Sequence, residues 1–284
     1  MNRIKSLFLS VILHLISTDG QLKSQEYTFD KRIIYQMTYQ TDSNDISSRK
    51  TMEMELLVNR SISLFQSLKQ RQRDSTLYFH NRNAAEVYSR VGGIVMRPVN
   101  KFNYKILKND NTIHVYDSVF GMNMDGKDIV YTYSERISDM DWKIKEDTIH
   151  FGNYICQRAD LRYGNRNWTA WFAPEIPISN GPYKFSGLPG LIVRMSDDTE
   201  SWIFDMVLLE KTDIKHAINF QKWHVIQEKK KIDLYRDRYE YQQNLPVITA
   251  GARPENGDMD RYRMSRERFL KSLENDNNWI ELYP

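Results

Sequence analysis

The sequence predicts a mainly β fold, and three observations support this prediction. Apolar and polar residues alternate with a period of two over most of residues 27–210, as in strands with one buried face. Aromatic residues make up 12% of the chain, and bulky rings favour strands. Short turn sequences separate the strand-like runs without intervening helical patterns. We therefore expect a curved antiparallel sheet or incomplete barrel with C-terminal helices, a shape analogous to the lipoprotein-carrier fold.

The first 20 residues have the composition of an export signal. Arg3 and Lys5 supply positive charge, residues 7–16 (LFLSVILHLI) are mostly apolar, and small residues lie between 17 and 20. A membrane span needs about 20 apolar residues, so this run is too short to be one. A buried N-terminal helix is the alternative. We expect residues 1–20 to be a signal peptide, cleaved near residue 20, and the mature protein to be periplasmic or secreted.

Strand-like runs follow one another through the next part of the chain, which we expect to form one β domain from residue 21 to residue 215. The expected strands lie at residues 33–39, 52–58, 61–67, 129–133, 159–163, 168–172, 191–195 and 202–208. Turns are expected at Asn59–Arg60, at GNRN (164–167) and at DDTE (197–200), and Asp125–Gly126 is typical of a hairpin turn. In the first strand Ile33, Tyr35 and Met37 should share one buried face.

The C-terminal region, residues 216–284, is highly charged. Helices are expected over residues 219–243 and 258–276, with a polar loop over 244–258 between them. Their mixed charges are typical of solvated helix faces. The formal net charge of the chain is only +3, which argues against a nucleic-acid partner.

A proline-rich and glycine-rich segment precedes the strand at 191–195. Prolines at 174, 177, 182 and 189 predict a stiff, extended loop over residues 173–187. Pro189–Gly190 has the composition of a type II turn with a positive φ at Gly190, and Leu188 and Leu191 should pack on apolar surface. The segment lacks both common nucleotide-binding glycine patterns and precedes a strand instead of a helix. We therefore interpret it as an architectural turn.

This segment carries a resemblance to a known family. GPYKF (181–185) and GLPGLI (187–192) lie within residues 142–197, a stretch that resembles the GLPGLI family, and the closing NNWIEL is similar as well. Trp279 departs from the proline expected in relatives. The resemblance implies an exported protein of Gram-negative bacteria, often encoded near outer-membrane receptor machinery, and it implies no activity. The predicted structural motif consists of Gly187, Leu188, Pro189, Gly190, Leu191 and Ile192.

No pattern in the sequence predicts a catalytic, cofactor-binding or metal-binding residue. The histidines beyond residue 20 are His80, His114, His150, His216 and His224, and none forms a metal-ligand pair. The lone Cys156 rules out an internal disulfide and is expected to be buried. On one continuous strand His150 and Cys156 would lie about 20 Å apart, too far for a nucleophile and its base. Glu175 has no assignable partner acid.

Aromatic residues gather around the proline-rich loop and form the candidate binding groove. The candidates are Trp168, Trp171, Phe172, Tyr183 and Phe185, of which Trp171 is favoured because alternation places it opposite its neighbours. Core packing is the alternative interpretation.

Three functions remain open from sequence. The leading hypothesis is a non-enzymatic periplasmic binding or accessory protein that takes a lipid, a peptide or an outer-membrane partner on an aromatic-lined concave face. The alternatives are an envelope scaffold without a ligand cavity and a hydrolase with an unrecognised site.

Overall fold

A computed structural model of the protein describes residues 25–72, 102, 104–117, 128–218, 224–249 and 259–282. The predicted signal peptide (1–20) and the Asp125–Gly126 turn lie outside these residues, as does His80. The described elements are, in chain order, β1 (Gln25–Gln40), β2 (Arg49–Val58), β3 (Ile62–Ser67), β4 (Tyr104–Asn109), β5 (Thr112–Asp117), β6 (Asp128–Arg136), β7 (Lys143–Phe151), β8 (Tyr154–Tyr163), β9 (Arg166–Ala173), β10 (Leu191–Asp197), β11 (Trp202–Ile218), β12 (His224–Glu228), α3 (Lys231–Thr249) and α4 (Met259–Glu274).

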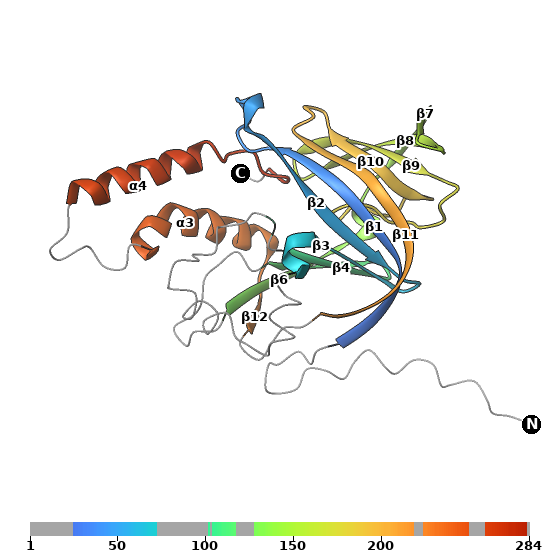
Figure 1. Ribbon diagram of the computed structural model, residues 1–284, viewed down its shortest axis with the longest axis horizontal. Helices are drawn as coiled ribbons and strands as arrows, with labels where there is room; N and C mark the ends of the chain where they lie inside the picture. Colours follow the sequence, from blue (N-terminus) through green and yellow to red (C-terminus); the bar gives the residue numbers. More distant parts are fainter. Residues whose placement is uncertain are drawn as a thin grey trace, which may run out of the picture.

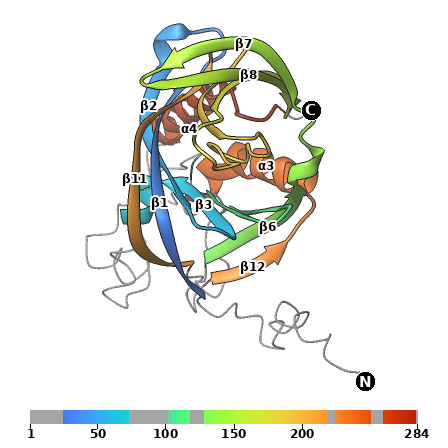
Figure 2. The ribbon, with the colours of Figure 1, turned by 90° about the vertical axis from the view of Figure 1, so that its right-hand side faces the viewer.

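The described strands form one large, strongly curved sheet (Figures 1 and 2). Its strand order is β12-β6-β5-β4-β3-β2-β1-β11-β10-β9-β8-β7, so that β12 and β7 form its edges. Neighbouring strands are antiparallel except for β12 and β6, which are parallel. The predicted mainly β, curved antiparallel fold with C-terminal helices is therefore confirmed.

The alternation in the sequence accounts for the strand faces. Ile33, Tyr35 and Met37 of β1 are all fully buried, as predicted. The GNRN turn is also confirmed: Gly164 and Asn165 have φ values of 58° and 57°, so they form a tight left-handed hairpin turn between β8 and β9. Each of the predicted strand runs lies within an observed strand, except that β3 begins at Ile62, one residue after the predicted start. The sequence pattern did not predict strands at β4, β5, β7 or β12.

The C-terminal region differs from the prediction at two places. Residues 224–228, predicted as helix, form β12, because this short segment pairs in parallel with residues 128–132 of β6. Pairing with an existing sheet edge here overrides the helical appearance of a charged run. In addition, α3 continues through Pro246 to Thr249, so the first six residues of the predicted polar loop are helical.

The proline-rich loop, residues 174–190, lies inside the curve of the sheet, with α3 on the same side (Figure 2). Phe185 is fully buried there, and its ring centroid lies 4.9 Å from that of Trp168 on β9. Leu234 of α3 belongs to the same hydrophobic core. The loop is therefore a core element that fills the concave side of the sheet. The prediction of an extended loop was wrong in part, because the loop contains tight turns.

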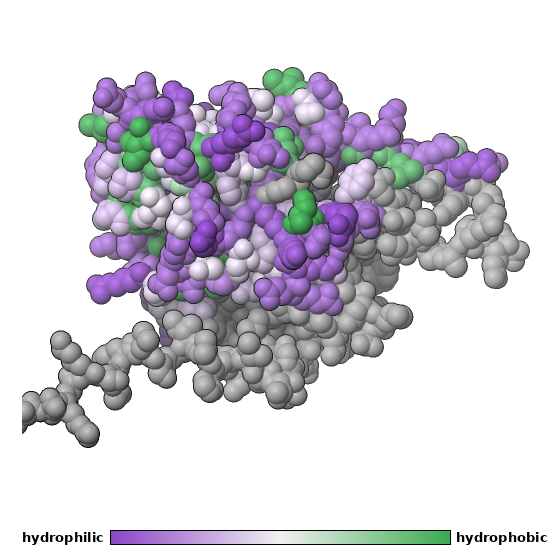
Figure 3. All heavy atoms as spheres, turned by 180° about the vertical axis from the view of Figure 1, so that it is seen from behind, coloured by the Kyte–Doolittle hydropathy of each residue, from purple (hydrophilic) through white to green (hydrophobic). Residues whose placement is uncertain are grey.

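The surface seen from behind is predominantly hydrophilic, with small, scattered hydrophobic areas (Figure 3). Among the described helices, none combines the length and the apolar composition that a membrane crossing requires.

Candidate functional site

Most of the GLPGLI turn is buried, with Gly187 and Pro189 exposed, but its backbone differs from the predicted type II turn. Leu188, Leu191 and Ile192 are at most 1% exposed. Gly190 does not have a positive φ; in this motif that conformation occurs at Gly187, with φ 95°. Gly190 is needed for another reason, since a Cβ there would lie 2.3 Å from the carbonyl oxygen of Ala173. Close approach of two backbones, and not a left-handed turn, explains this glycine.

The amides of this turn bond to carbonyls of the protein. Gly190 N donates to Leu188 O at 2.9 Å, Leu191 N donates to Ile176 O at 3.1 Å, and Ile192 N donates to Asn180 O at 3.0 Å. An anion cradle would need such amides to converge on an open space. The turn joins β9 and β10 through backbone contacts.

The predicted aromatic groove residues lie mostly in the core. Trp168, Phe172, Tyr183 and Phe185 are at most 3% exposed. They pack against one another inside the sheet, so they do not line an open groove. Trp171 is half-buried and lies in register with Arg158 of β8 and Arg194 of β10.

A buried polar cluster joins the loop to α3 and the C-terminal tail. Lys184 Nζ lies 2.5 Å from Glu281 Oε1 and 2.6 Å from Glu135 Oε2, and it donates to Tyr133 Oη at 2.9 Å. Lys231 of α3 forms ion pairs with both carboxylates. Tyr183 donates its hydroxyl proton to Glu281. Two cations and two carboxylates thus neutralise each other, and of these Lys184 and Glu281 are fully buried whereas Lys231 and Glu135 are partly exposed.

Mutual neutralisation fixes the charges of this cluster. Burial tends to raise the pKa of Glu281, but Lys184 and Lys231 outweigh this and hold that pKa at about 2. Burial likewise tends to lower the pKa of Lys184, but Glu281 and the neighbouring acidic groups raise it above its ordinary value. Burial also raises the pKa of Tyr183 well above its usual range. None of these three groups exchanges a proton readily near pH 7.

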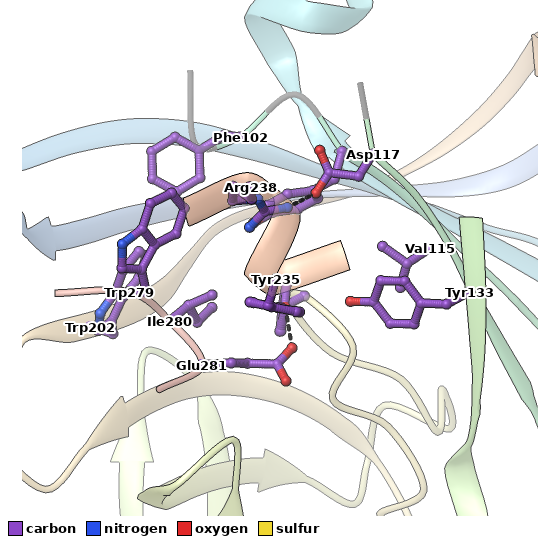
Figure 4. A pocket seen from close by; sticks show the side chains of 12 residues that line it. Phe102, Val115, Asp117, Tyr133, Trp202, Tyr235, Arg238, Trp279, Ile280 and Glu281 are labelled. Atoms are coloured by element: carbon purple, nitrogen blue, oxygen red, sulfur yellow. Dashed lines mark hydrogen bonds and ion pairs between the residues drawn. The ribbon is translucent and has the colours of Figure 1, made fainter. Parts of the chain in front are cut away.

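The pocket beside this cluster, shown in Figure 4, is lined largely by aromatic rings together with Glu281 and the Arg238–Asp117 ion pair. Its volume is about 20 Å³. That is room for about one water molecule, far below the roughly 300 Å³ of a small-ligand site. We call it the inner pocket. Because the inner pocket is too small for a ligand and is lined by an ion pair, we interpret it as part of the packed core.

A larger depression, which we call the outer groove, lies beside the same loop. Its volume is about 460 Å³. It is lined by the turn between β2 and β3 (residues 58–63), the end of β4 and its turn (108–110), residues 177–180 of the loop, and parts of β1. Asn180 Nδ2 donates to Ser63 Oγ at 2.8 Å, which fastens the loop to β3. This volume is in the range of small-ligand sites.

Lys108 is a buried cation in the lining of the outer groove. It is 3% exposed, and its Nζ donates to the carbonyl oxygens of Gly181, Tyr183 and Phe185 at 3.1, 3.2 and 3.2 Å. In the described part of the chain it forms no ion pair with a carboxylate. Burial lowers its pKa to about 7. Lys108 is thus the buried amine whose charge changes near neutral pH.

The remaining chemical candidates do not form a catalytic pair. Cys156 is fully buried, as predicted. The 20 Å separation from His150 was wrong, because a turn at Gly152 folds β7 onto β8 and pairs Ile149 with Cys156. His150, the next residue along β7, therefore points to the opposite face of the sheet. Glu175 Oε1 accepts a hydrogen bond from Ile155 N at 3.0 Å and so ties the loop to β8.

Groups of histidine, cysteine, aspartate and glutamate that could hold a metal ion do not occur among the described residues.

Comparisons with known proteins show what the chain is similar to. A family described as "Protein of unknown function (Porph_ging)" matches residues 163–194, which include the GLPGLI turn. Curated proteins gave no match. Two solved structures of PNGF-II, in the P21 and C2 space groups, are similar with TM-scores of 0.50 and identities of 13% and 11%. Each match covers 75% of this chain but only 34% or 33% of the other chain, and at this identity it shows the fold alone.

Sequence reasoning missed the charged residues that define the two sites. Lys108 follows Ile106 and Leu107 in a short apolar run, and Lys184 lies between Tyr183 and Phe185. The one sequence signal for such a site is a lysine flanked by residues that favour burial. Such a lysine is expected to have partners in the fold, because lysines are rarely buried without them. The partners themselves come from distant parts of the chain, as with Glu281.

Proposed function

We propose that the protein is an exported, non-enzymatic binding or accessory protein of the cell envelope, and that the outer groove is its binding site. The apolar segment near the N-terminus and the resemblance to the GLPGLI family support export to the periplasm. One observation carries the choice of site: the groove of about 460 Å³ lies beside the GLPGLI-containing loop and has a buried cation in its lining.

The fixed charges beside the inner pocket argue against acid–base catalysis at that pocket. A general acid or base works best with a pKa near the working pH. Glu281 has a pKa of about 2 and Lys184 has a raised pKa, so their charges are fixed at neutral pH. The size of the same pocket argues against the lipid that the sequence analysis included among the expected ligands. The inner pocket, with about 20 Å³ of free volume, does not accommodate a lipid.

The small size of the inner pocket also favours the second candidate function, an envelope scaffold that meets protein partners without holding a small ligand. The two candidates make different predictions for material that copurifies with the protein. A binding protein carries a small molecule or peptide in the outer groove, whereas a scaffold retains only a protein partner.

The test is native mass spectrometry and pull-down of residues 21–284, purified from the periplasm with a mild membrane extract. Ser179→Trp fills the groove from an exposed position in its lining, and Lys50→Trp adds the same ring at an exposed position of β2 away from it. We expect a bound small molecule or peptide on the wild type and on Lys50→Trp, and its loss in Ser179→Trp. A protein partner retained by all three would support the scaffold. Equal small-molecule retention by all three would contradict the choice of site.

A further inference from the structure

Lys108 differs in its partners from three other buried cations of the described chain. Lys184, Arg166 and Arg238 each form an ion pair with a buried or half-buried carboxylate. Lys108 has only the three backbone carbonyls of the loop. An ionised group taken out of water without an opposite charge is strongly disfavoured. The positive charge of Lys108 is therefore uncompensated by the residues that surround it.

The contacts of Lys108 are also weaker than charge-assisted bonds usually are. Its Nζ lies 3.1 to 3.2 Å from the carbonyl oxygens, whereas an ammonium and a carboxylate typically approach to about 2.7–2.9 Å. The neutral carbonyls orient the amine but contribute no net charge. An anion in the groove would feel the field of Lys108, which is screened less than that of an exposed charge because Lys108 is buried.

The rim of the outer groove adds a second cation. Arg60 is exposed in the turn between β2 and β3, and no described residue pairs with it. Lys31 is less available, because it forms an ion pair with Asp30 at 3.1 Å. Asp110 supplies the other carboxylate of the lining. The groove consequently has more positive than negative charges, and Arg60 presents a guanidinium suited to bidentate recognition of an anion.

We propose that the outer groove binds its ligand through one anionic group, a carboxylate or a phosphate, which contacts Arg60 at the rim and lies in the field of Lys108. This inference rests on the proposed function and names the chemistry of its ligand. The rest of the ligand lies against loop residues 177–180.

Proton linkage follows from the same arrangement. Burial lowers the pKa of Lys108 to about 7, and a nearby anion favours its charged form, so binding takes up a proton above pH 7. The other charged groups that line the groove are Asp30, Lys31, Arg60 and Asp110. The affinity for an anion should therefore fall as the pH rises above about 7.

The experiment is isothermal titration of purified residues 21–284 with acetate and, separately, with inorganic phosphate, at constant ionic strength and pH 6.5. The two probes distinguish the two anion chemistries. Because the field of a buried charge is weakly screened, we expect about tenfold weaker binding in Lys108→Met. Arg60 is exposed, and we expect Arg60→Gln to weaken binding about two- to fivefold. Arg162→Gln, at an exposed site on β8, should bind like the wild type.

Acetate provides the pH test because its charge is constant from pH 6 to 8.5, and we expect wild-type affinity to fall over that range. Arg60 lies outside the core, so Arg60→Gln and the pH series remain decisive if Lys108→Met does not fold. No binding of either probe, equal affinity in Arg60→Gln and Arg162→Gln, or a pH-independent affinity for acetate would each overturn the inference. If a copurifying ligand is still lost in Ser179→Trp, the proposed function stands while this inference falls.

Discussion

The charged cluster beside the inner pocket and the outer groove both adjoin the proline-rich loop, and each includes a buried lysine. Lys184 faces two carboxylates and a tyrosine hydroxyl, and its pKa is raised. Lys108 faces three carbonyls, and its pKa is lowered to about 7. The residue type and the burial are the same, but the partners differ. A compensated buried charge fastens the fold, whereas an uncompensated one beside an open groove is available to a ligand.

The largest expected loss of stability comes from removing Lys184, the buried lysine whose charge is compensated by carboxylates. Lys184→Met leaves Glu135 and Glu281 with Lys231 as their shared partner, so a buried negative charge remains unpaired. We expect a loss of about 3–5 kcal/mol in the free energy of unfolding, measured by chemical denaturation.

The matched control for this prediction is the double variant Lys184→Met/Glu281→Gln, which removes one charge of each sign. It should lose less than the sum of the single variants. Additive losses, or a loss below 1 kcal/mol in Lys184→Met, would show that the cluster does not act as a compensated unit.

The next effect tests the turn that both regions share. Gly190→Ala places a Cβ 2.3 Å from the carbonyl oxygen of Ala173, and we expect a loss near the upper end of the roughly 1–3 kcal/mol typical of overpacking. Gly152→Ala is the comparison. A Cβ at this position would meet no atom within 4 Å, but the residue has a φ of 57°. Strain alone should cost that variant about 1–2 kcal/mol. Equal losses in thermal or denaturant unfolding would argue against the close backbone contact.

The third prediction concerns the pH dependence of stability on the uncompensated side. An unfolded lysine has a pKa of about 10.4, and Lys108 in the fold has one of about 7. Between these values the unfolded chain holds a proton that the folded chain lacks, so stability rises with pH. Below pH 7 both states hold the proton and the penalty is constant.

Lys108→Met removes this dependence. From pH 6 to 8.5 the wild type should gain about 2 kcal/mol of stability relative to the variant. Denaturant titrations of both proteins at each pH, in buffers without carboxylate or phosphate, check this. Parallel pH profiles would mean that Lys108 keeps an ordinary pKa in the fold.

The smallest effect separates the aromatic cluster from the binding site. Trp171 is half-buried, so Trp171→Ala should cost about 1–2 kcal/mol, compared with about 3–5 kcal/mol for Trp168→Ala in the core. We expect Trp171→Ala to fold and to retain any ligand of the outer groove. A folded Trp171→Ala protein that loses its ligand would return the binding site to the outer face of β9.

The sequence predicted the strands better than the site, for physical reasons. Alternation is a local pattern, so a strand such as 33–39 was visible from its own residues. β12 was not visible, because pairing with β6 decides its structure. Gly190 was recognised as necessary but for the wrong reason, since its close contact with Ala173 depends on the packing of two strands.

The sites themselves depend on contacts between distant segments. The inner pocket brings Glu281 to Lys184 across 97 residues, and the outer groove brings Lys108 to Gly181 across 73. No local pattern reports such contacts. The same limit applied to His150 and Cys156, whose separation could be judged only after the turn between them was known.

The two lysine side chains can be compared directly by following their amine resonances in a heteronuclear NMR titration, assigned with Lys108→Met and Lys184→Met. We expect Lys108 to titrate near pH 7 and Lys184 to remain protonated at pH 10. If Lys108 instead titrates together with the exposed lysines near pH 10, its charge is compensated in the folded protein, and the distinction between the two regions is wrong.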